Sequence, residues 1–239
     1  MDNSIVIPDD AVKYILFQRT GYIKYAKGKF FGLFNKYSPW SFYNKAIIWE
    51  ATRRNKEIKD LFQKDMFNIY RSIKAHLPEE CSSMLDIGCG VGGIDLFLFR
   101  HYHHDESLQL YLLDKTTIDT RVFYNYKSKG SFYNSLQLTS DILSINGVPE
   151  GNIHLLEATD DNQINVDQRV DLVISLISWG FHYPVSTYLS RVHELLREKG
   201  RLIIDLRKNT DGIKELERKF SSVTPFTESK KSLRVVAIK

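Results

Sequence analysis

Short apolar runs alternate with helically spaced segments along most of this 239-residue chain. From about residue 83 onward the apolar runs are bounded by polar or glycine-containing turns, which is typical of buried strands. Five runs predict strands: 83–87, 108–113, 153–158, 170–177 and 201–206. Several are apolar along most of their length, as parallel strands are when both faces of their sheet are covered.

The segments between these strands predict the helices that cover the sheet. They are 94–101, 134–146, 185–198 and 211–220, and Gly147 and Gly200 end two of them. Two β-like segments, 221–226 and 232–238, close the chain and can form a hairpin. The pattern therefore predicts an α/β protein with a Rossmann-like, doubly wound, mostly parallel seven-stranded sheet and an antiparallel C-terminal hairpin.

The first 80 residues do not follow this alternation. Apolar positions recur at helical spacing over 46–77, until Pro78 ends the pattern, and nine aromatic residues crowd into 22–43. We expect an N-terminal helical appendage or lid over 1–80 and a ligand-binding domain over 81–239. The alternative for the appendage is a helical cover for the outer face of the sheet.

Composition indicates an ordinary soluble globular protein, 43% hydrophobic and 26% charged. Cys81 and Cys89 fit no disulfide or zinc framework, so a reducing, cytoplasmic location is the simplest interpretation. Residues 1–10 lack the basic region and apolar run of a signal peptide. No apolar stretch is long enough to cross a bilayer.

The formal net charge of +4 does not by itself imply a nucleic acid partner. Seven basic residues with no acid among them run from Lys13 to Lys45. A solvated face is one explanation, and a site that attracts an anionic substrate or a membrane surface is the other.

A glycine-rich turn at 88–93 follows the first strand and opens a helix. Its glycines let a ligand approach the main chain, and the helix N-terminus adds free N–H donors. The spacing G-x-G-x-x-G also fits NAD or FAD. Asp86, however, would repel a pyrophosphate, whereas it suits the ammonium and sulfonium of S-adenosylmethionine.

Residues 85–92 resemble motif I of the class I S-adenosylmethionine-dependent methyltransferases. Asp114 matches the acidic residue that binds the ribose in that family, and 157–160 matches the segment that borders the adenine. Residues 171–178 resemble motif IV, and 195–204 resemble the signature before the fifth strand. The resemblance implies a cofactor site made by Asp86, Gly88, Cys89, Gly90, Gly92, Asp114, Lys115, Ala158, Thr159, Asp160, Ser175 and Leu176.

Two of these residues have a plainer interpretation. Asp160 has acidic neighbours, Glu157 and Asp161, that could take its role. Cys89 is expected to be a small packing residue, because no basic residue lies beside it in the sequence to activate a thiolate.

The methyl acceptor is expected beside the carboxyl ends of the fourth and fifth strands. His182 is the preferred general base, since a near-neutral pKa suits proton abstraction; the alternative is a structural histidine. The predicted substrate-binding residues are Ser178, Trp179, Phe181, Tyr183 and Arg207. The aromatic ones could instead pack a helix against the sheet, and Arg207 could be a plain surface charge.

No carboxylate stands at the carboxyl end of the fourth strand, where metal-dependent O-methyltransferases hold their cation, so no metal is expected. Asp171 lies at the other end of that strand. Residues 36–49 and 121–132 are candidate lids that would exclude water from the site.

These features predict a metal-independent S-adenosylmethionine-dependent methyltransferase acting on a small molecule or glycan, at oxygen. An RNA or protein methyltransferase that holds a polyanion with its basic N-terminus is the alternative acceptor class, so nucleic acid is the less favoured partner. An NAD(P)-dependent oxidoreductase and a catalytically silent methyltransferase-like subunit are the alternatives beyond it. The sequence leaves the oligomeric state open.

Overall fold

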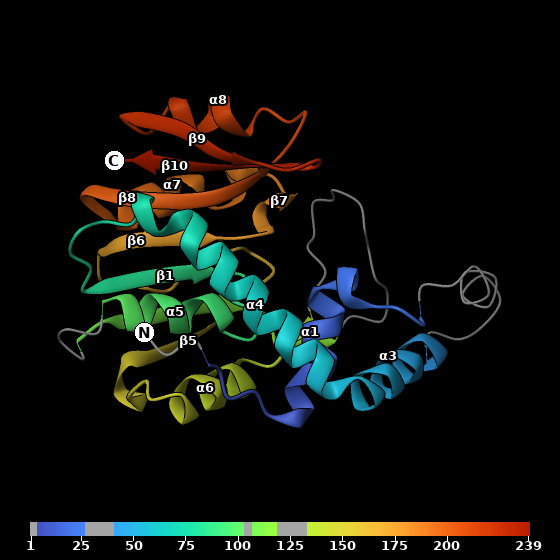
Figure 1. Ribbon diagram of the computed structural model, residues 1–239. Coiled ribbons are helices and arrows are strands. Elements are labelled where there is room, and N and C mark those ends of the chain that lie inside the picture. The colour runs from blue at the N-terminus through green and yellow to red at the C-terminus, as the bar shows by residue number, and fades with distance from the viewer. Residues whose placement is uncertain (1–3, 27–40, 103–106, 119–132) are drawn as a thin grey trace.

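A seven-stranded sheet forms the centre of the molecule (Figure 1). The computed structural model describes residues 4–26, 41–102, 107–118 and 133–239. The strands are β1 (Ser83–Ile87), β2 (Gln109–Asp114), β5 (Ile153–Glu157), β6 (Val170–Ser175), β8 (Leu196–Arg207), β9 (Ser222–Glu228) and β10 (Ser232–Ile238). Their order across the sheet is β5-β2-β1-β6-β8-β10-β9.

The first five strands of that order are parallel, and β10 is antiparallel to both β8 and β9. Each predicted strand is present, and the two closing segments pair as a hairpin. The predicted α/β class, with its mostly parallel sheet and antiparallel C-terminal edge, is therefore confirmed.

Alternate residues of the strands point into two separate hydrophobic clusters. Met84, Leu112 and Ile174 belong to one cluster. Leu85 and Val173, each the chain neighbour of a residue on the opposite face, belong to the other. Both faces of the sheet are buried, which explains why the strands carry apolar residues at successive positions.

One face is covered by α4 (Asn55–Ile73), α5 (Gly93–His101) and α6 (Leu136–Ile145). The opposite face carries α7 (Leu189–Leu195) and α8 (Gly212–Glu217). Short 3-10 turns occur at Asp9–Ala11, Thr20–Tyr22, Lys74–His76, Glu150–Asn152 and Val185–Thr187. No helix of the described residues is both long enough and apolar enough to span a bilayer.

The N-terminal helices α1 (Val12–Gln18) and α3 (Ser41–Arg53) lie near the carboxyl ends of the parallel strands (Figure 1). The buried side chains of α1 share one hydrophobic cluster with α4 and with a face of the sheet. Glu50 of α3 accepts the backbone N–H groups of Lys24, Tyr25 and Ala26 and pairs with the buried Arg54. These bonds anchor the chain that follows α1, so the end of α1 is held against the sheet.

Two segments differ from the predicted elements. Residues 178–183, expected as a turn, form the strand β7 (Ser178–Tyr183), which lies against β8. The helix predicted over 185–198 ends at Leu195, because Leu196 already pairs with Val170 of β6 and is extended. A short antiparallel pair of strands, β3 (Thr117–Ile118) with β4 (Tyr133–Asn134), was not predicted.

Candidate functional site

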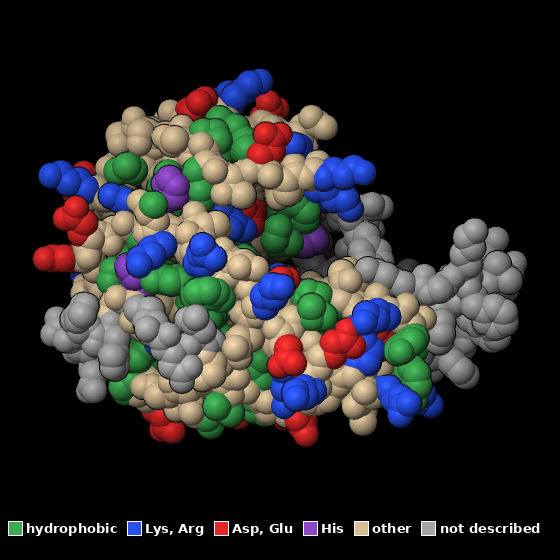
Figure 2. Space-filling model, in the orientation of Figure 1, with side chains coloured by type: hydrophobic (Ala, Val, Ile, Leu, Met, Phe, Trp, Pro, Cys, Tyr) green, Lys and Arg blue, Asp and Glu red, His purple; other side chains and the backbone are tan. Residues whose placement is uncertain are grey.

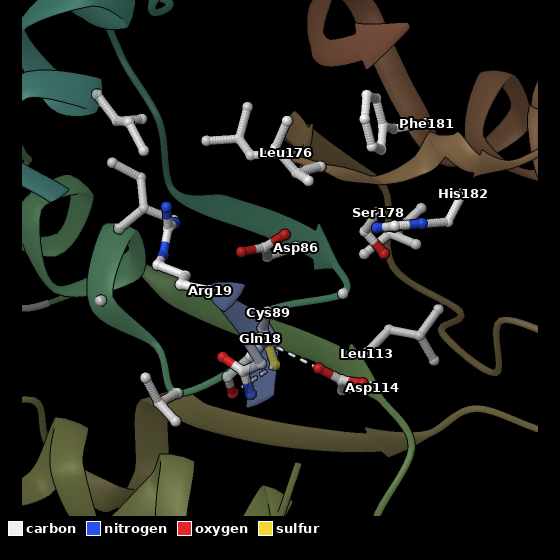
Figure 3. Close-up of a pocket in the computed structure, with 18 of the residues that line it drawn as sticks. Gln18, Arg19, Asp86, Cys89, Leu113, Asp114, Leu176, Ser178, Phe181 and His182 are labelled. Atoms are coloured by element: carbon white, nitrogen blue, oxygen red, sulfur yellow. Dashed lines mark hydrogen bonds between the residues drawn. The ribbon is translucent and has the colours of Figure 1, made fainter. Parts of the chain in front are cut away.

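A cavity of about 350 Å³ opens at the carboxyl ends of β1, β2, β6 and β8, and the end of α1 also lines it. Its size suits a small ligand. Figure 3 shows Asp86 near its centre, with Arg19 on one side and the residues of β7 on the other. This is the switch region of an open α/β sheet, where ligands bind in such folds.

The glycine-rich turn between β1 and α5 forms the floor of this cavity. Gly88, Gly90 and Gly92 have φ angles of +84°, +56° and +73°, which side-chain-bearing residues rarely adopt. A Cβ atom on Gly88 would lie 2.0 Å from Ser178 Oγ, and one on Gly90 would lie 2.6 Å from Gln18 Oε1. The turn therefore exposes its main chain to the cavity only because it is built of glycine.

The peptide groups flanking Gly90 are held in place from several sides. The Gly90 N–H donates to Asp114 Oδ2 over 2.8 Å. The Gly90 carbonyl accepts the Thr139 hydroxyl at 2.6 Å and the Asn134 amide at 2.5 Å. Gln18 of α1 donates to Asn134 Oδ1 at 3.4 Å. The turn is thus tied to α1, β2, β4 and α6 before any ligand arrives, which is a preorganised cradle.

Asp114, at the end of β2, also accepts the Lys115 N–H at 2.7 Å with its second oxygen. Desolvation raises its pKa to about 6, against the opposing effect of the bonds from Lys115, Gly90 and Asn134. A ligand hydroxyl that donates to this carboxylate would favour its charged form.

Asp86 is the most unusual group in the cavity. It is 2% exposed, and its Oδ1 has no hydrogen-bond partner among the described residues. Asp95 of α5 is fully buried nearby, and both of its oxygens are likewise without a partner there. Burial, together with Asp95 and Asp114, raises the pKa of Asp86 well above the ordinary range; burial also raises that of Asp95. Like charges this close cannot both ionise easily, so the empty site favours a cationic ligand.

Arg19 brings a positive charge to the same part of the cavity. Its guanidinium lies 5.7 Å from the ring centroid of Phe62 and donates to Met66 Sδ at 3.7 Å, both on α4. Burial lowers its pKa, and Tyr22 and Asp65 oppose that effect. An acidic site for an ammonium and a basic site for a carboxylate therefore lie in one chamber, as an amino-acid group requires.

The opposite wall is formed by β7 and the end of β8. His182 lines the cavity, and both burial and the charge of Arg207 lower its pKa. The Arg207 guanidinium lies 5.4 Å from the ring centroid of Phe181 and donates to the Phe181 carbonyl at 3.5 Å. A neutral imidazole beside a fixed cation can accept a proton from a substrate hydroxyl.

Seven of the predicted cofactor-binding residues line the cavity: Asp86, Gly88, Cys89, Gly90, Asp114, Ala158 and Leu176. Burial raises the pKa of the Cys89 thiol, and the nearby carboxylates of Asp114, Asp86 and Asp95 raise it further. A thiol with a raised pKa suits a packing residue rather than a nucleophile.

The other five predicted cofactor residues lie elsewhere. Gly92 faces Thr139 and Leu143 of α6. The Ser175 hydroxyl donates to the Ile87 carbonyl and accepts the Trp179 N–H, so it fixes the turn after β6. The remaining three, Lys115, Thr159 and Asp160, lie outside the lining of the cavity, and Lys115 and Asp160 form an ion pair.

Of the predicted acceptor residues, Ser178, Phe181, His182, Tyr183 and Arg207 line the cavity. Trp179 does not. It is fully buried under Tyr188, and its indole N–H donates to the Val185 carbonyl. Trp179 is therefore a packing residue of the core, which is the plainer interpretation that the sequence left open for the aromatic residues.

The cavity also contains residues from outside the motifs that were not predicted: Phe17, Gln18, Arg19, Thr20, Phe62, Met66, Ile69, Tyr188 and Lys231. Asn134 and Thr139, which hold Gly90, were missed as well. The basic run from Lys13 contained Arg19, but nothing in it distinguished that residue from its neighbours. The candidate lid 121–132 lies outside the described residues, as does 36–40 of the other candidate lid.

Within the described residues, no three His, Cys, Asp or Glu side chains are grouped so as to hold a metal ion. Asp171 lies at the far end of β6, where it accepts from Ser82 and Ser83 and pairs with Arg197.

No protein-family model and no curated protein matches the sequence. Solved structures do match its fold. A putative O-methyltransferase from Nostoc punctiforme has a TM-score of 0.55 and 14% identity, over 96% of this chain and 72% of that one. Precorrin-6y C5,15-methyltransferase from Geobacter metallireducens has a TM-score of 0.51 and 14% identity, over 73% and 87% of the two chains.

A third similar structure is the T. thermophilus 16S rRNA N2 G1207 methyltransferase, solved with AdoMet and guanosine. It has a TM-score of 0.50 and 14% identity, over 73% of this chain and 42% of that one. The chain therefore has the Rossmann-like fold of the class I S-adenosylmethionine-dependent methyltransferases, as its motifs predicted. These proteins are named for different acceptors, so the fold leaves the acceptor class open.

Proposed function

We propose that this protein is a metal-independent S-adenosylmethionine-dependent methyltransferase that acts at an oxygen of a small molecule or glycan. The observation that carries the proposal is the buried Asp86 carboxylate, unpartnered at Oδ1 among the described residues, at the centre of a glycine-floored cavity. A buried carboxylate without a partner is costly unless a ligand compensates it. A cationic amino group supplies that compensation, whereas a pyrophosphate would add to the repulsion.

The other cavity residues suit the remaining parts of the cofactor. Asp114 is placed to accept the ribose hydroxyls, and the backbone around Gly88 and Gly90 lies open to the ligand. Ala158, at the end of β5, would border the adenine. Arg19 would receive the carboxylate of the amino-acid group, because its guanidinium is held by α4 on the same side as Asp86.

S-adenosylmethionine supplies a methyl group already activated by the positive sulfur. His182 would take the proton of the acceptor hydroxyl as the oxygen forms its bond to the methyl carbon and the carbon–sulfur bond breaks. The products are a methyl ether, a neutral thioether and a protonated imidazole that returns its proton to solvent. A carboxylate acceptor would instead give a methyl ester, with no proton for His182 to remove. Ser178, Phe181 and Tyr183 would position the acceptor and exclude water from it.

The direct test is transfer of an isotope-labelled methyl group from S-adenosylmethionine into a cell extract. We expect label in the small-molecule or glycan fraction, resistant to ribonuclease and protease. Mild base separates the two oxygen products, because methyl esters are hydrolysed and methyl ethers are not. Label that ribonuclease or protease releases would replace this acceptor class with RNA or protein.

Asp86→Asn tests the cofactor site. Its matched control is Asp60→Asn, which removes the same charge at an exposed position on α4. Incorporation should fall with the first variant and persist with the second. Cofactor binding without incorporation into any fraction would instead point to a catalytically silent subunit. Binding of NADH in place of S-adenosylmethionine would point to an oxidoreductase.

A further inference from the structure

We infer that Asp95 is a positioning residue of the cofactor site, which shares one proton with Asp86 and so holds the Asp86 carboxylate toward the ammonium group of the cofactor. The inference rests on the proposed S-adenosylmethionine site and adds a second residue to it. Asp86 lines the cavity and Asp95 does not, so Asp95 acts on the ligand only through Asp86.

The geometry of β1 and α5 brings the two carboxyl groups together. Met84 and Leu85 of β1 point to opposite faces of the sheet, so Asp86 shares the face of Met84. That face is covered by α5, which carries Asp95 in its first turn. The side chains of Asp86 and Asp95 lie within hydrogen-bonding reach of each other. Two ionised carboxylates can only accept hydrogen bonds, so this contact requires a proton.

Three oxygen atoms of the pair are shielded from solvent and have no hydrogen-bond partner within the described chain. They are Oδ1 of Asp86 and both oxygens of Asp95. The Asp86 residue is 2% exposed, and Asp95 is fully buried. Buried polar atoms without a partner are costly. One shared proton supplies the missing donor, satisfies an oxygen of each group and leaves the pair with a single negative charge.

Helix capping does not explain Asp95. An acidic side chain in the first turn often binds a free backbone N–H at the start of its helix. The N-cap residue of α5 is Gly92, and no side chain among the described residues caps this end. The Gly92 N–H donates instead to the Cys89 carbonyl at 3.1 Å. The position of Asp95 is therefore explained by its contact with Asp86 rather than by its own helix.

The neighbouring acidic groups make a second ionisation of the pair unfavourable. Burial raises the pKa of Asp86, and Asp95 and Asp114 raise it further. Burial also raises the pKa of Asp95. The charge of Asp86 reaches two other titratable groups, Cys89 of the glycine-rich turn and Tyr183 of β7, and burial is the main cause that raises the pKa of each. These groups stay neutral and add no positive charge, so the pair keeps a proton.

Arg19 is the cation that faces Asp86 in the same part of the cavity (Figure 3). Its guanidinium donates to Met66 Sδ rather than to a carboxylate of the pair. Burial lowers the pKa of Arg19, and the charges that act on it further are those of Tyr22, Asp65 and Arg234. Arg19 therefore does not neutralise the pair. An amino-acid group can place its ammonium at Asp86 and its carboxylate at Arg19.

The proton is expected on Asp95 when the cofactor is bound. The negative charge is then favoured at Asp86, because Asp86 is the member of the pair that lines the cavity. The N-terminus of α5 favours the opposite arrangement, but direct contact with an ammonium is a stronger interaction than a helix dipole. Asp95 then donates to Asp86 and fixes the orientation of its carboxylate.

The first experiment measures S-adenosylhomocysteine binding by calorimetry in Asp95→Asn and Asp95→Leu. The Asn amide keeps a donor for Asp86, whereas Leu has a similar size and none. We expect affinity to fall about twofold in Asp95→Asn and about tenfold in Asp95→Leu, as loss of a hydrogen bond to a charged group predicts. Asp60→Asn, an exposed charge on α4, is the control and should bind as wild type.

Thermal unfolding of the empty proteins separates positioning from packing. Asp95→Leu should be no less stable than wild type, because it removes a buried carboxyl group without a partner among the described residues. A residue that only packs would lower stability in both variants, and Asn would not rescue binding.

Carbon-13 NMR of the aspartate carboxyl groups locates the proton in protein saturated with S-adenosylhomocysteine. Loss of a signal in Asp86→Asn and in Asp95→Asn assigns the two groups. We expect a carboxylate signal for Asp86 and a carboxylic acid signal for Asp95 at neutral pH. Should Asp95→Leu fail to fold, these signals still decide the question.

The inference is overturned if Asp95→Leu binds as tightly as wild type, if both Asp95 variants lose equal affinity, or if Asp86 and Asp95 are both ionised in the loaded protein. Failure of the wild type to bind S-adenosylhomocysteine removes the proposed function itself. Binding that Asp86→Asn weakens and Asp95→Leu does not removes only the role of Asp95.

Discussion

The two halves of the cavity use different parts of the chain to make their contacts. At the ends of β1 and β2, the glycine turn presents backbone groups, and Asp114, Asn134 and Thr139 hold that backbone still. At the ends of β6 and β8, side chains of β7 line the cavity, among them His182, the proposed base, and Arg207 at the end of β8 adds a cation. We call the first the acidic half after Asp86 and Asp114, although Arg19 also lies there, and the second the basic half after His182 and Arg207.

This difference explains how one fold can keep the same cofactor while its acceptor changes. Backbone contacts depend on glycine and on a fixed turn, so few substitutions are compatible with them. The side chains of β7 and β8 that line the cavity, such as His182 and Arg207, are not part of the buried core, so they can be exchanged without altering the sheet. The acidic half is therefore expected to determine the cofactor, and the basic half the acceptor.

The largest effect should come from the basic half, through His182. His182→Gln should lower kcat by about 10²–10⁴-fold, the range for loss of a general base, while leaving S-adenosylhomocysteine affinity unchanged. Labelled methyl transfer and calorimetry measure the two quantities. His193→Gln, on α7, is the matched control. Unchanged turnover in His182→Gln would leave His182 a structural role only.

Gly88→Ala should disable the acidic half through the backbone. The new Cβ would lie 2.0 Å from Ser178 Oγ at a φ of +84°, so the turn must move. We expect a stability loss of about 1–3 kcal/mol, typical of such strain, with loss of cofactor binding. Thermal unfolding with and without S-adenosylhomocysteine measures both. Gly151→Ala, with no atom within 4 Å of its Cβ, should behave as wild type.

Asp86→Asn, in the same half, should weaken cofactor binding without lowering the stability of the empty protein. It removes the charge that meets the ammonium, worth about 1.5–3 kcal/mol for a charged hydrogen bond, so cofactor affinity should fall about 10–150-fold. The empty protein should become no less stable, because a buried carboxylate without a partner among the described residues is removed. If both affinity and stability are lost together, Asp86 is a structural group.

Acid should weaken cofactor binding through Asp114. Its folded-state pKa is raised to about 6, so it is neutralised below that pH and accepts ribose hydroxyls less well. The stability of the empty protein should move oppositely. A raised carboxyl pKa contributes stability below the ordinary value of 3.8, and this is lost as pH rises through about 6. Calorimetry and thermal unfolding between pH 5 and 8 test the two trends, and Asp114→Asn should reduce both. The part of the stability trend that remains comes from Asp86 and Asp95, whose pKa values are also raised.

The smallest effect should come from the hydrogen bonds that hold the Gly90 carbonyl. Asn134→Ala removes one of two donors to the Gly90 carbonyl, one donor to Asp114 and the acceptor of Gln18. The Thr139 hydroxyl still holds the Gly90 carbonyl, and the Gly90 and Lys115 N–H groups still hold Asp114. One neutral hydrogen bond contributes about 1 kcal/mol, so cofactor affinity should fall about fivefold. Calorimetry measures it. An effect as large as that of Asp86→Asn would show that Asn134 meets the ligand directly.

The acidic half could be predicted from sequence because its contacts are local. Asp86, Gly88 and Gly90 lie within one turn, and Asp114 ends the next strand, so motif and order together placed them. The sheet was predictable for a similar reason, since burial on both faces leaves continuous apolar runs.

The basic half and the entrance were harder to predict because they depend on tertiary packing. β7 was not predicted as a strand, because its extended conformation depends on packing against β8. Trp179 shares the β7 segment with Phe181 and Tyr183, which line the cavity, and nothing in its residue type distinguishes it from them. Arg19 reaches the cavity because α1 packs on α4, more than 35 residues away in the chain, and no local pattern encodes that contact.

The most direct test of the central claim is calorimetric titration of the purified protein with S-adenosylhomocysteine and, separately, with NADH. The account predicts saturable one-to-one binding of the sulfur nucleoside, weakened in Asp86→Asn, and no binding of the dinucleotide. Tight binding of NADH with no heat from S-adenosylhomocysteine would contradict it.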